Sequence, residues 1–245
     1  MFKFLLSLVL LLPTLVSASD LSQSQIDLIT DKLFAADPNL PISEFSKSPV
    51  EGFVEVTLAG GETLAVSGDG EYLFAGKLFQ ITDTGFKDIA DERAAVQRGE
   101  YFSKNDPDKL GGIVFPANGE VKKKMFVFTD ISCGFCRKLH KETVPDLQKA
   151  GIEVVYLGFP REGLDGNAKK DLDTAFCSDD QQTTLTALKN RESVPAKTCD
   201  SPVAEHYALA KQFGINSTPS TVLSDGTLIR GYMLAPAMLK ALGVE

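Results

Sequence analysis

Residues 125–136 read MFVFTDISCGFC, and this stretch predicts the fold of the domain around it. The apolar run from Met125 to Phe128 is typical of a buried strand, and two cysteines follow at the expected start of a helix. At a helix N-terminus, unpaired backbone N–H groups and the positive end of the helix dipole favour a thiolate over a thiol. The pattern therefore predicts a catalytic dithiol, in which the Cys133 thiolate attacks another disulfide and Cys136 resolves the product.

Two other interpretations of this Cys-x-x-Cys pair are a zinc half-site and a pair of inert buried cysteines. A structural zinc site needs four ligands, commonly from two such pairs or from one pair plus two histidines. The rest of the chain offers Cys177, Cys199, His140 and His206, which lack the spacing of such ligands. We therefore expect no metal and no cofactor, and the strand followed by a helix favours redox chemistry over an inert pair.

The N-terminus predicts export. Lys3 precedes an apolar run at residues 4–12, and small residues follow up to Ala18. This is the pattern of a secretory signal peptide over residues 1–18, with cleavage near Ala18. A membrane anchor is the alternative, but Pro13 and the polar residues after it interrupt the roughly 20 apolar residues that a span needs. We expect a protein without membrane insertion, in an oxidising compartment.

Charge and cysteine content exclude several classes of protein. The chain holds 25 Lys and Arg residues, one of them in the leader, against 33 Asp and Glu. This acidic balance disfavours nucleic acid or an anionic membrane surface as the main partner. Four cysteines are too few for a disulfide scaffold, and the length allows a sizeable core in one or two domains.

Cys177 and Cys199 are predicted to form a structural disulfide, the default for two further cysteines in an oxidising compartment. Closing that loop would stabilise the chain by roughly 3 kcal/mol. The alternative is a second redox pair that relays electrons. The separation of 22 residues and the lack of a helix-start context favour the structural role.

The first part of the mature chain, residues 19–83, predicts a small domain that dimerises. Residues 22–25 have the pattern of a capping box before an amphipathic helix that ends near Asp37. Because a helix and a small sheet of this size make a marginal core, we expect this region to pair with a copy of itself. The strands of that sheet are predicted at residues 52–58, 62–67 and 72–80.

Residues 84–108 predict a solvated linker helix, since many charged residues surround a few weakly apolar ones. A surface helix of one continuous domain is the alternative interpretation. The linker leads to a second domain over residues 109–245.

The second domain alternates strand, helix and strand. Strands at residues 124–129 and 152–157 flank a helix at residues 135–149, which predicts a parallel pair of strands. Pro145 is expected to kink that helix without ending it. A helical insertion, a hairpin and a last helix are predicted at residues 161–213, 221–230 and 236–242. The predicted fold class is α+β.

The sequence around the two cysteines closely resembles the active-site segment of the DsbC and DsbG family of bacterial periplasmic protein disulfide isomerases. Phe135 departs from that family, whose best-known members carry Tyr at this position. Residues 20–100 fit the family's N-terminal domain and linker in length and layout. The similarity covers residues 128–140 and continues in the same order through residues 158–165, Cys177, and residues 199–200, 206–210 and 214–219.

The resemblance implies a homodimer. Each protomer would carry a thioredoxin-like catalytic domain with a helical insertion, preceded by a small cystatin-like dimerisation domain and a linker helix. Thr218-Pro219 would be the family's cis-proline loop, which offers backbone groups to the substrate chain beside the active site. The implied partners are misfolded disulfide-containing exported proteins and a membrane thiol reductase of the DsbD type. The implied location is the periplasm.

The favoured hypothesis is that the chain reduces and isomerises incorrect disulfides in exported proteins. Three other functions use the same cysteines or the same dimeric plan. They are a monomeric dithiol oxidase, a DsbG-like reductase of sulfenylated cysteines, and a holdase chaperone that works without its thiols.

The two histidines are given no catalytic role. His140 follows Cys136 by one turn, close enough to tune a thiolate, but an exposed position on the helix face is the expectation. His206 precedes the Thr218-Pro219 loop and is expected to cap or to pack.

Overall fold

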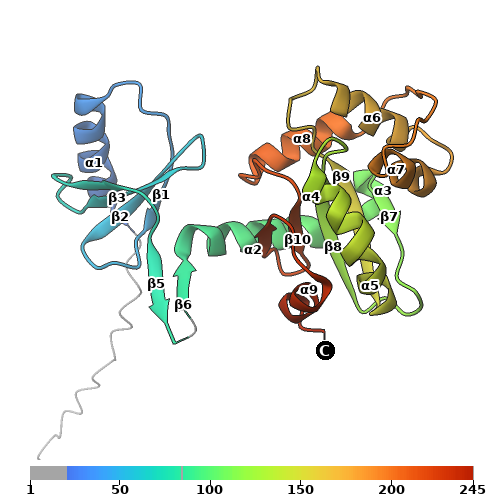
Figure 1. Cartoon of the computed structure of the whole chain (residues 1–245). Coiled ribbons are helices and arrows are strands. Elements are labelled where there is room, and N and C mark those ends of the chain that lie inside the picture. The colour runs from blue at the N-terminus through green and yellow to red at the C-terminus, as the bar shows by residue number, and fades with distance from the viewer. Residues whose placement is uncertain (1–20, 84, 245) are drawn as a thin grey trace, which may run out of the picture. The chain divides into compact units, whose positions relative to one another are not determined.

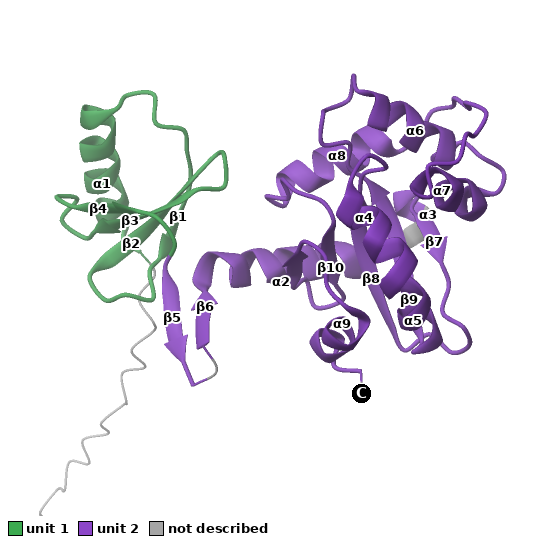
Figure 2. Cartoon of the chain, viewed as in Figure 1, with its two compact units in different colours: residues 1–77 green, residues 78–245 purple. Residues whose placement is uncertain are grey.

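The computed structural model describes residues 21–83 and 85–244, and the chain forms two compact units (Figures 1 and 2). One unit ends at Lys77 and the other begins at Leu78. The expected signal peptide, residues 1–18, lies outside the described residues. Within the described ranges, no helix is both long and apolar enough to cross a membrane.

In the first unit, one helix packs on a four-stranded antiparallel sheet. Helix α1 (Gln23–Ala36) begins after Ser22, whose side chain accepts a hydrogen bond from the Gln25 backbone, so the predicted cap is confirmed. The helix buries Ile29 and Leu33 against inward side chains of β2 and β3. The strands stand in chain order: β1 (Ile42–Lys47), β2 (Phe53–Leu58), β3 (Thr63–Ser67) and β4 (Leu73–Ala75).

In this region the sequence misses one strand, and one strand prediction is wrong. The sequence does not predict β1, because a register shift between Ile42 and Glu44 breaks the alternation of apolar and polar residues. The run at residues 72–80 is also not one strand. It is interrupted at Gly76, where φ is 151°, and its end belongs to a separate hairpin of β5 (Phe79–Thr82) and β6 (Gly85–Asp88).

The second unit is built on a five-stranded sheet with the order β11-β10-β8-β9-β7. Strands β8 and β9 are parallel, as the predicted strand–helix–strand unit requires, and the other neighbours are antiparallel. The predicted hairpin near the C-terminus is also confirmed. The sequence misses β7, whose three residues are too few to show an alternating pattern. The bounds are β7 (Ile113–Phe115), β8 (Lys123–Thr129), β9 (Ile152–Gly158), β10 (Ser220–Leu223) and β11 (Leu228–Arg230).

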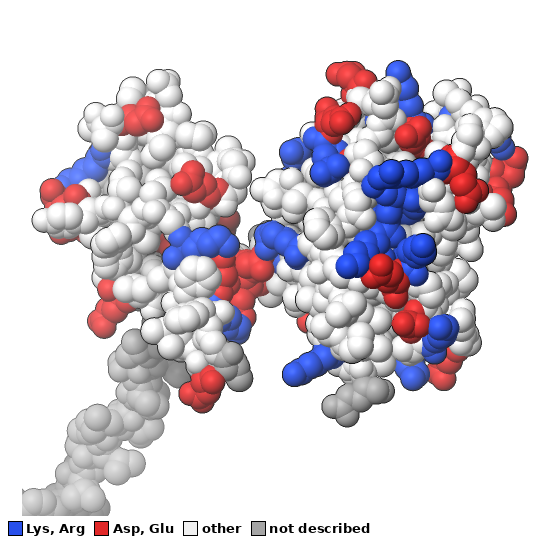
Figure 3. Space-filling model, viewed as in Figure 1, with Lys and Arg blue, Asp and Glu red and all other residues white. Residues whose placement is uncertain are grey.

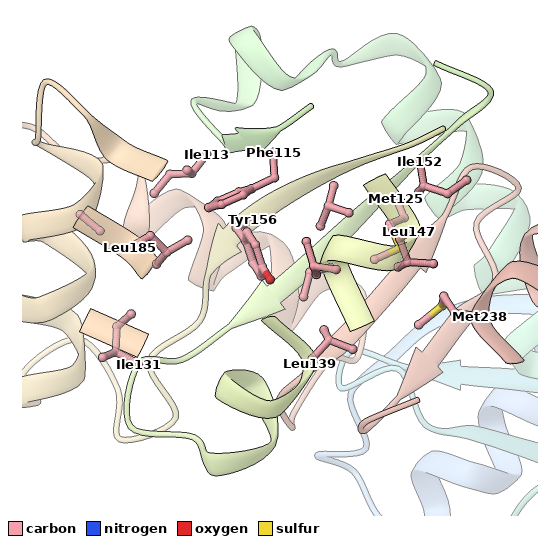
Figure 4. Packing of buried hydrophobic residues seen from close by; sticks show 14 of the residues in the cluster. Ile113, Phe115, Met125, Ile131, Leu139, Leu147, Ile152, Tyr156, Leu185 and Met238 are labelled. Carbon is pink, nitrogen blue, oxygen red and sulfur yellow. The ribbon is translucent and has the colours of Figure 1, made fainter. Parts of the chain in front are cut away.

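Alternating side chains of β8 divide the core of this unit into two layers. Met125 and Val127 face one layer, which Figure 4 shows, and Phe126 and Phe128 face the other. Helices cover both layers, which confirms the α+β class. The first layer is covered by η1 (Leu139–Thr143), which continues α4 (Gly134–Lys138), and by α5 (Val144–Lys149), α6 (Asn167–Phe176), α7 (Gln181–Lys189) and α9 (Ala235–Leu242). The second is covered by α2 (Ile89–Lys104), α3 (Pro107–Leu110) and the end of α8 (Val203–Gln212).

Helix α2 is charged and solvated along most of its length, as the charge pattern predicts, but Arg98 and Phe102 are buried in the second unit. Its Phe102 stacks on Phe126 with ring centroids 4.1 Å apart. Arg98 is 1% exposed, and its Nε donates a hydrogen bond to the Gly226 carbonyl oxygen over 2.8 Å. Gly226 has φ of 85°, and a Cβ there would lie 1.7 Å from the carbonyl oxygen of Ala95. Only glycine therefore lets the helix approach this turn.

The helix after the cysteines changes its winding in the middle. A π-helical turn, η1 (Leu139–Thr143), lies between α4 and α5. Pro145 has no N–H to donate, and the wider turn before it accommodates the missing hydrogen bond. The backbone stays helical from Gly134 to Lys149, so Pro145 does not end the helix, as predicted.

Candidate functional site

Cys133 lies where the central strand β8 gives way to a helix. It is the N-cap residue of α4, and its Sγ accepts a hydrogen bond from the Cys136 backbone nitrogen over 3.4 Å. Cys133 is 3% exposed, Cys136 is fully buried, and both are free thiols. The structure thus brings the two candidate catalytic residues together at a helix start.

The surroundings of Cys133 lower its pKa from 9.0 to about 5. The largest cause is a hydrogen bond from the Cys136 thiol, which stabilises the thiolate more than burial opposes it. The Thr218 side chain, the Cys136 backbone amide and the positive charge of Arg161 lower it further. Cys133 is therefore ionised at neutral pH, and the thiolate is the nucleophilic form of cysteine.

Cys136 behaves in the opposite way. Burial raises the pKa of its thiol far above the ordinary value, and the hydrogen bond to Cys133 raises it further. The positive charge of Lys189 lowers it. The pair thus combines one thiolate with one protonated thiol. This is the arrangement that an attacking cysteine and a resolving cysteine require.

The Thr218-Pro219 segment lies beside Cys133, although 85 residues separate Thr218 from it in the sequence. The thiol of Cys133, when protonated, donates to the Thr218 carbonyl oxygen over 3.3 Å, and the Thr218-Pro219 peptide bond is cis. Thr218 Oγ1 is buried and has no hydrogen-bond partner among the residues described. This hydroxyl is available to donate to the thiolate form of Cys133.

A buried carboxylate, Asp130, supports the loop between β8 and Cys133. Its Oδ2 accepts hydrogen bonds from the Arg161 backbone nitrogen over 2.9 Å and from Arg161 Nε over 3.1 Å. Its Oδ1 accepts from the backbone and the hydroxyl of Ser132. Burial would raise the pKa of Asp130, but these hydrogen bonds outweigh it and hold the pKa below 3.8. Sequence reasoning gave neither Asp130 nor Arg161 a role, because only the fold brings them together.

A buried lysine near Cys136 was also missed from the sequence. Lys189, the last residue of α7, is 3% exposed, and its Nζ donates to Thr129 Oγ1 over 2.7 Å. The same Nζ lies 5.2 Å from the centroid of the Tyr156 ring, which Figure 4 shows in the core. Lysine at a helix C-terminus is an ordinary surface residue, so its type and position give no signal of burial.

His140 is buried, so the prediction of an exposed helix-face residue is wrong. Its Nδ1 lies 2.9 Å from the Tyr156 hydroxyl, and its Nε2 lies 3.0 Å from Thr186 Oγ1. Cys136, Leu139 and His140 stand at the i, i+3 and i+4 spacing of one helix face, and all three are buried, so His140 lies on the core side of the helix. Burial lowers the pKa of His140 to about 4, and the ring is neutral at pH 7.

His206 has the packing role that the sequence predicts. Its Nδ1 accepts a hydrogen bond from the Gly158 backbone nitrogen over 3.1 Å, and its Nε2 donates to the Leu110 carbonyl oxygen over 2.6 Å. Burial lowers the pKa of His206 to about 4. A neutral ring with one acceptor and one donor satisfies both backbone groups.

Cys177 and Cys199 are joined by a disulfide, with Cα atoms 5.6 Å apart. The closed loop contains the whole of α7. The bond leaves neither cysteine free to bind zinc. In the part of the chain that the structure describes, no group of three or more His, Cys, Asp or Glu residues is placed to hold a metal ion.

The surface next to the cysteines is aromatic and positively charged. Phe135 is 62% exposed and stacks with Tyr232, with ring centroids 6.5 Å apart. Lys138 Nζ lies 4.6 Å from the centroid of the Tyr232 ring. Figure 3 shows Lys and Arg side chains gathered on the visible face of the second unit, although the chain as a whole is acidic.

Comparison with known families assigns both parts of the chain. A model of the thioredoxin-like domain matches residues 115–243. A model of the N-terminal domain of disulfide bond isomerase proteins matches residues 17–90. A solved linker-deletion mutant of Proteus mirabilis ScsC matches with a TM-score of 0.52 and 16% identity, over 63% of this chain and 83% of that chain. That likeness concerns the fold alone, and the thioredoxin-like prediction for the second domain is confirmed.

Curated relatives match across both parts. The thiol:disulfide interchange protein DsbC of Escherichia coli K12 is 34% identical over 190 residues, which cover 78% of this chain and 76% of the relative. DsbC of Haemophilus influenzae is 34% identical over 195 residues, covering 80% and 81%. DsbC of Salmonella typhimurium is 33% identical over 199 residues, covering 81% and 79%. The chain belongs to the DsbC family of thiol:disulfide interchange proteins.

Proposed function

We propose that this chain reduces and isomerises incorrect disulfides in exported proteins, with Cys133 and Cys136 as its catalytic residues. The observation that carries the proposal is the contrast between the two thiols. Cys133 is ionised at the start of a helix, and Cys136 is held protonated directly beside it. Membership of a family named for thiol:disulfide interchange supports the same chemistry.

The first step is attack by the Cys133 thiolate on one sulfur of a substrate disulfide. A bond forms between Cys133 Sγ and that sulfur while the substrate S–S bond breaks. The electron pair of the broken bond leaves on the other substrate sulfur as a thiolate. The product is a mixed disulfide between Cys133 and the substrate.

Two routes resolve this mixed disulfide. In isomerisation, another substrate thiolate attacks the substrate sulfur of the mixed disulfide and releases Cys133 as a thiolate, with no net transfer of electrons. In reduction, Cys136 loses its proton and attacks Cys133 Sγ, so the enzyme pair becomes a disulfide and the substrate gains two electrons. A membrane thiol reductase of the DsbD type would then return two electrons to Cys133 and Cys136.

Thr218 and Pro219 are proposed to bind the substrate chain. They lie beside the attacking sulfur, since the Thr218 carbonyl oxygen is 3.3 Å from Cys133 Sγ. A substrate chain that reaches Cys133 must pass these backbone groups. Pro219 is buried and holds the segment in place.

We further propose a periplasmic homodimer with the domain limits expected from the sequence. These are a signal peptide at residues 1–18, cleaved near Ala18, a dimerisation domain at 19–83, a linker helix at 84–108 and a catalytic domain at 109–245. Strand β4 supports the dimer, because it ends its sheet and exposes adjacent apolar side chains. Those side chains are Tyr72, Leu73 and Phe74, which are 70%, 52% and 65% exposed.

The decisive test is refolding of scrambled ribonuclease by the full mature chain. Wild type should restore ribonuclease activity, Cys133→Ser should not, and Cys136→Ser should accumulate mixed disulfides that gel electrophoresis without reductant detects. Full refolding by Cys133→Ser would contradict the proposal. A control is Ser224→Ala, which changes an exposed residue of the turn between β10 and β11 and leaves both thiols.

The dimer is tested by sedimentation of the full mature chain. Wild type should sediment as a dimer, and Phe74→Ser should shift the equilibrium toward the monomer. Val96→Ser, at a 62% exposed position on α2, serves as the control for loss of an exposed apolar side chain. A wild-type monomer at micromolar concentration would contradict the dimer.

A further inference from the structure

Lys189 is a buried cation without a carboxylate partner. Its ammonium group is covered by the protein, and its hydrogen bond goes to a neutral hydroxyl, Thr129 Oγ1, at 2.7 Å. No ion pair of Lys189 occurs between residues of the described ranges. Removing a charge from water without an opposite charge is costly, so a buried lysine in this state needs a physical reason.

The buried carboxylate of Asp130 does not form an ion pair with Lys189. Asp130 is fully buried, but its two oxygens are already engaged by Arg161 and Ser132. The negative charge of Asp130 still acts on Lys189, but less than that of the two cysteines. The anion that best matches Lys189 is therefore a thiolate, either that of Cys133 in the reduced protein or that of Cys136 during the resolving step.

The groups that face Lys189 from the elements packed around it are few. Cys136 and Arg137 belong to α4, Cys133 is its N-cap residue, and Asp130 lies in the loop before it. Tyr156 of β9 lies under the ammonium group, and its hydroxyl hydrogen-bonds with His140 of η1, whose neutral form Lys189 favours. Of these groups, Cys136 interacts with the lysine charge most strongly, and it is the one whose thiol must ionise inside the protein.

We propose that Lys189 is a positioning residue for the resolving step, because at neutral pH its buried ammonium group places a positive charge near Cys136 and so helps this buried thiol to ionise. The proposal rests on the proposed function, whose reductive route needs that ionisation. The Cys136 S–H bond gives its proton to water, and the resulting thiolate attacks Cys133 Sγ. The Cys133–Cys136 bond forms, the Cys133–substrate bond breaks, and the electron pair leaves on the substrate sulfur.

The position of the lysine is fixed by the fold. Thr129 is the last residue of β8, which leads to Cys133, and its hydroxyl holds the ammonium group at this end of the strand. Helix α7, which carries Lys189, is held in place by a second hydrogen bond, between Thr186 and His140. A neutral residue of similar length would fill the same space without the cost of burying a charge. A purely structural role therefore predicts that Lys189→Met is harmless.

The test separates the two thiols in one reaction on the full mature chain. Reduced protein is mixed with dithiobis(nitrobenzoate), and the coloured nitrothiobenzoate anion is followed by stopped flow. The first release reports attack by Cys133 on the reagent. The second release reports attack by Cys136 on the resulting mixed disulfide, so its rate and pH profile measure the resolving step alone.

Lys189→Met should slow the second release and move its pH profile to higher pH, while the first release changes less. Each unit by which the pKa of Cys136 rises reduces its thiolate about tenfold, and greater nucleophilicity restores part of this, so a net loss of about threefold per unit is expected. Lys189→Gln should behave like Lys189→Met, because it can still hydrogen-bond to Thr129 but carries no charge. Lys197→Met is the matched control. It removes an exposed lysine of the same closed loop, paired with Asp179, and should leave both releases unchanged.

Equal second releases in wild type and either folded Lys189 variant would overturn the inference, and thermal unfolding identifies which variants are folded. A wild-type rate in Lys189→Gln alone would overturn it as well, since the hydrogen bond rather than the charge would then matter. The two proposals fail differently. If the wild-type protein gives both releases but does not refold scrambled ribonuclease, the isomerase function is contradicted and the role of Lys189 is not. A wild type without a second release overturns the role of Lys189 and the reductive route, whereas isomerisation stands or falls with the ribonuclease test.

Discussion

The backbone nitrogen of Cys136 donates a hydrogen bond to Cys133 Sγ over 3.4 Å. The thiol of Cys136 donates to the same sulfur and is the largest cause of the low pKa of Cys133. The second cysteine therefore acts on the first before any disulfide forms between them. Its own thiol stays protonated because burial disfavours its ionisation.

The first prediction concerns the reactivity of Cys133. Its alkylation by iodoacetamide should follow a titration with a midpoint near pH 5, where its pKa lies. Cys136→Ala removes the thiol donor and should move the midpoint upward, whereas Cys136→Ser keeps a donor and should move it less. The rate is measured by mass spectrometry of the alkylated chain between pH 4 and pH 9. A midpoint that stays in place in Cys136→Ala would contradict this account.

The second prediction concerns the stability of the reduced protein. Between the pKa of Cys133 in the folded state, about 5, and its unfolded value near 9.0, the unfolded chain binds more protons than the folded chain. Stability relative to Cys133→Ala should therefore rise with pH across this window, by up to about 1.4 kcal/mol per pH unit, and fall as pH drops toward 5. Urea unfolding of both proteins measures the difference, in a reductant mild enough to keep Cys177–Cys199 closed. A difference that is flat with pH would argue against an ionised Cys133.

The third prediction concerns the buried carboxylate behind the active-site loop. Asp130→Asn should destabilise the fold by about 2 kcal/mol, because the hydrogen bonds from Arg161 and Ser132 lose their charged acceptor. The pKa of Asp130 is lowered in the folded state, so this contribution is present above about pH 4 and is lost as pH falls further. Denaturant unfolding at pH 7 and pH 3 measures both effects. Asp165→Asn, at an exposed position, is the control, and an equally small effect of both substitutions would refute the assignment.

The fourth prediction concerns the disulfide of the helical insertion. Replacing Cys177 and Cys199 together by alanine should lower the free energy of unfolding by roughly 3 kcal/mol, since the open loop gains entropy in the unfolded chain. The nitrothiobenzoate release by Cys133 should persist, because both active-site thiols remain. Unfolding in urea and stopped-flow release measure the two effects. Loss of the first release would instead indicate that Cys177 and Cys199 take part in the thiol exchange.

Local patterns predict the centre of the second domain and the start of the first helix well. The apolar run that becomes β8, the parallel partner β9, the last hairpin and the cap of α1 all follow from periodicity and turn residues close together in the chain. Each depends on interactions between near neighbours or on one strongly buried strand. Position alone also places Cys133 at a helix start.

Other features depend on contacts that no local pattern encodes. Lys189 and Asp130 are charged residues of types that are mostly exposed, and each is buried because a distant residue, Thr129 or Arg161, bonds to it. The exposed position predicted for His140 is wrong because the residue shares the buried helix face of Cys136, where distant Tyr156 and Thr186 bond to its ring. The buried side of α2 escapes prediction because Phe102 and Arg98 stand among many charged neighbours.

The loop closed by Cys177 and Cys199 gives the protein two sulfur pairs that must be kept in different oxidation states. The closed loop contains Thr186, which hydrogen-bonds with His140, and Lys189, which hydrogen-bonds with Thr129. An electron donor that reduces the Cys133–Cys136 disulfide must therefore leave Cys177–Cys199 oxidised. Reduction of both pairs would weaken the contacts that support the residues around the dithiol. Selectivity of the donor toward the two pairs is thus a condition for repeated turnover, and reductants that also open Cys177–Cys199 should slow the resolving step by Cys136 while the first attack by Cys133 persists.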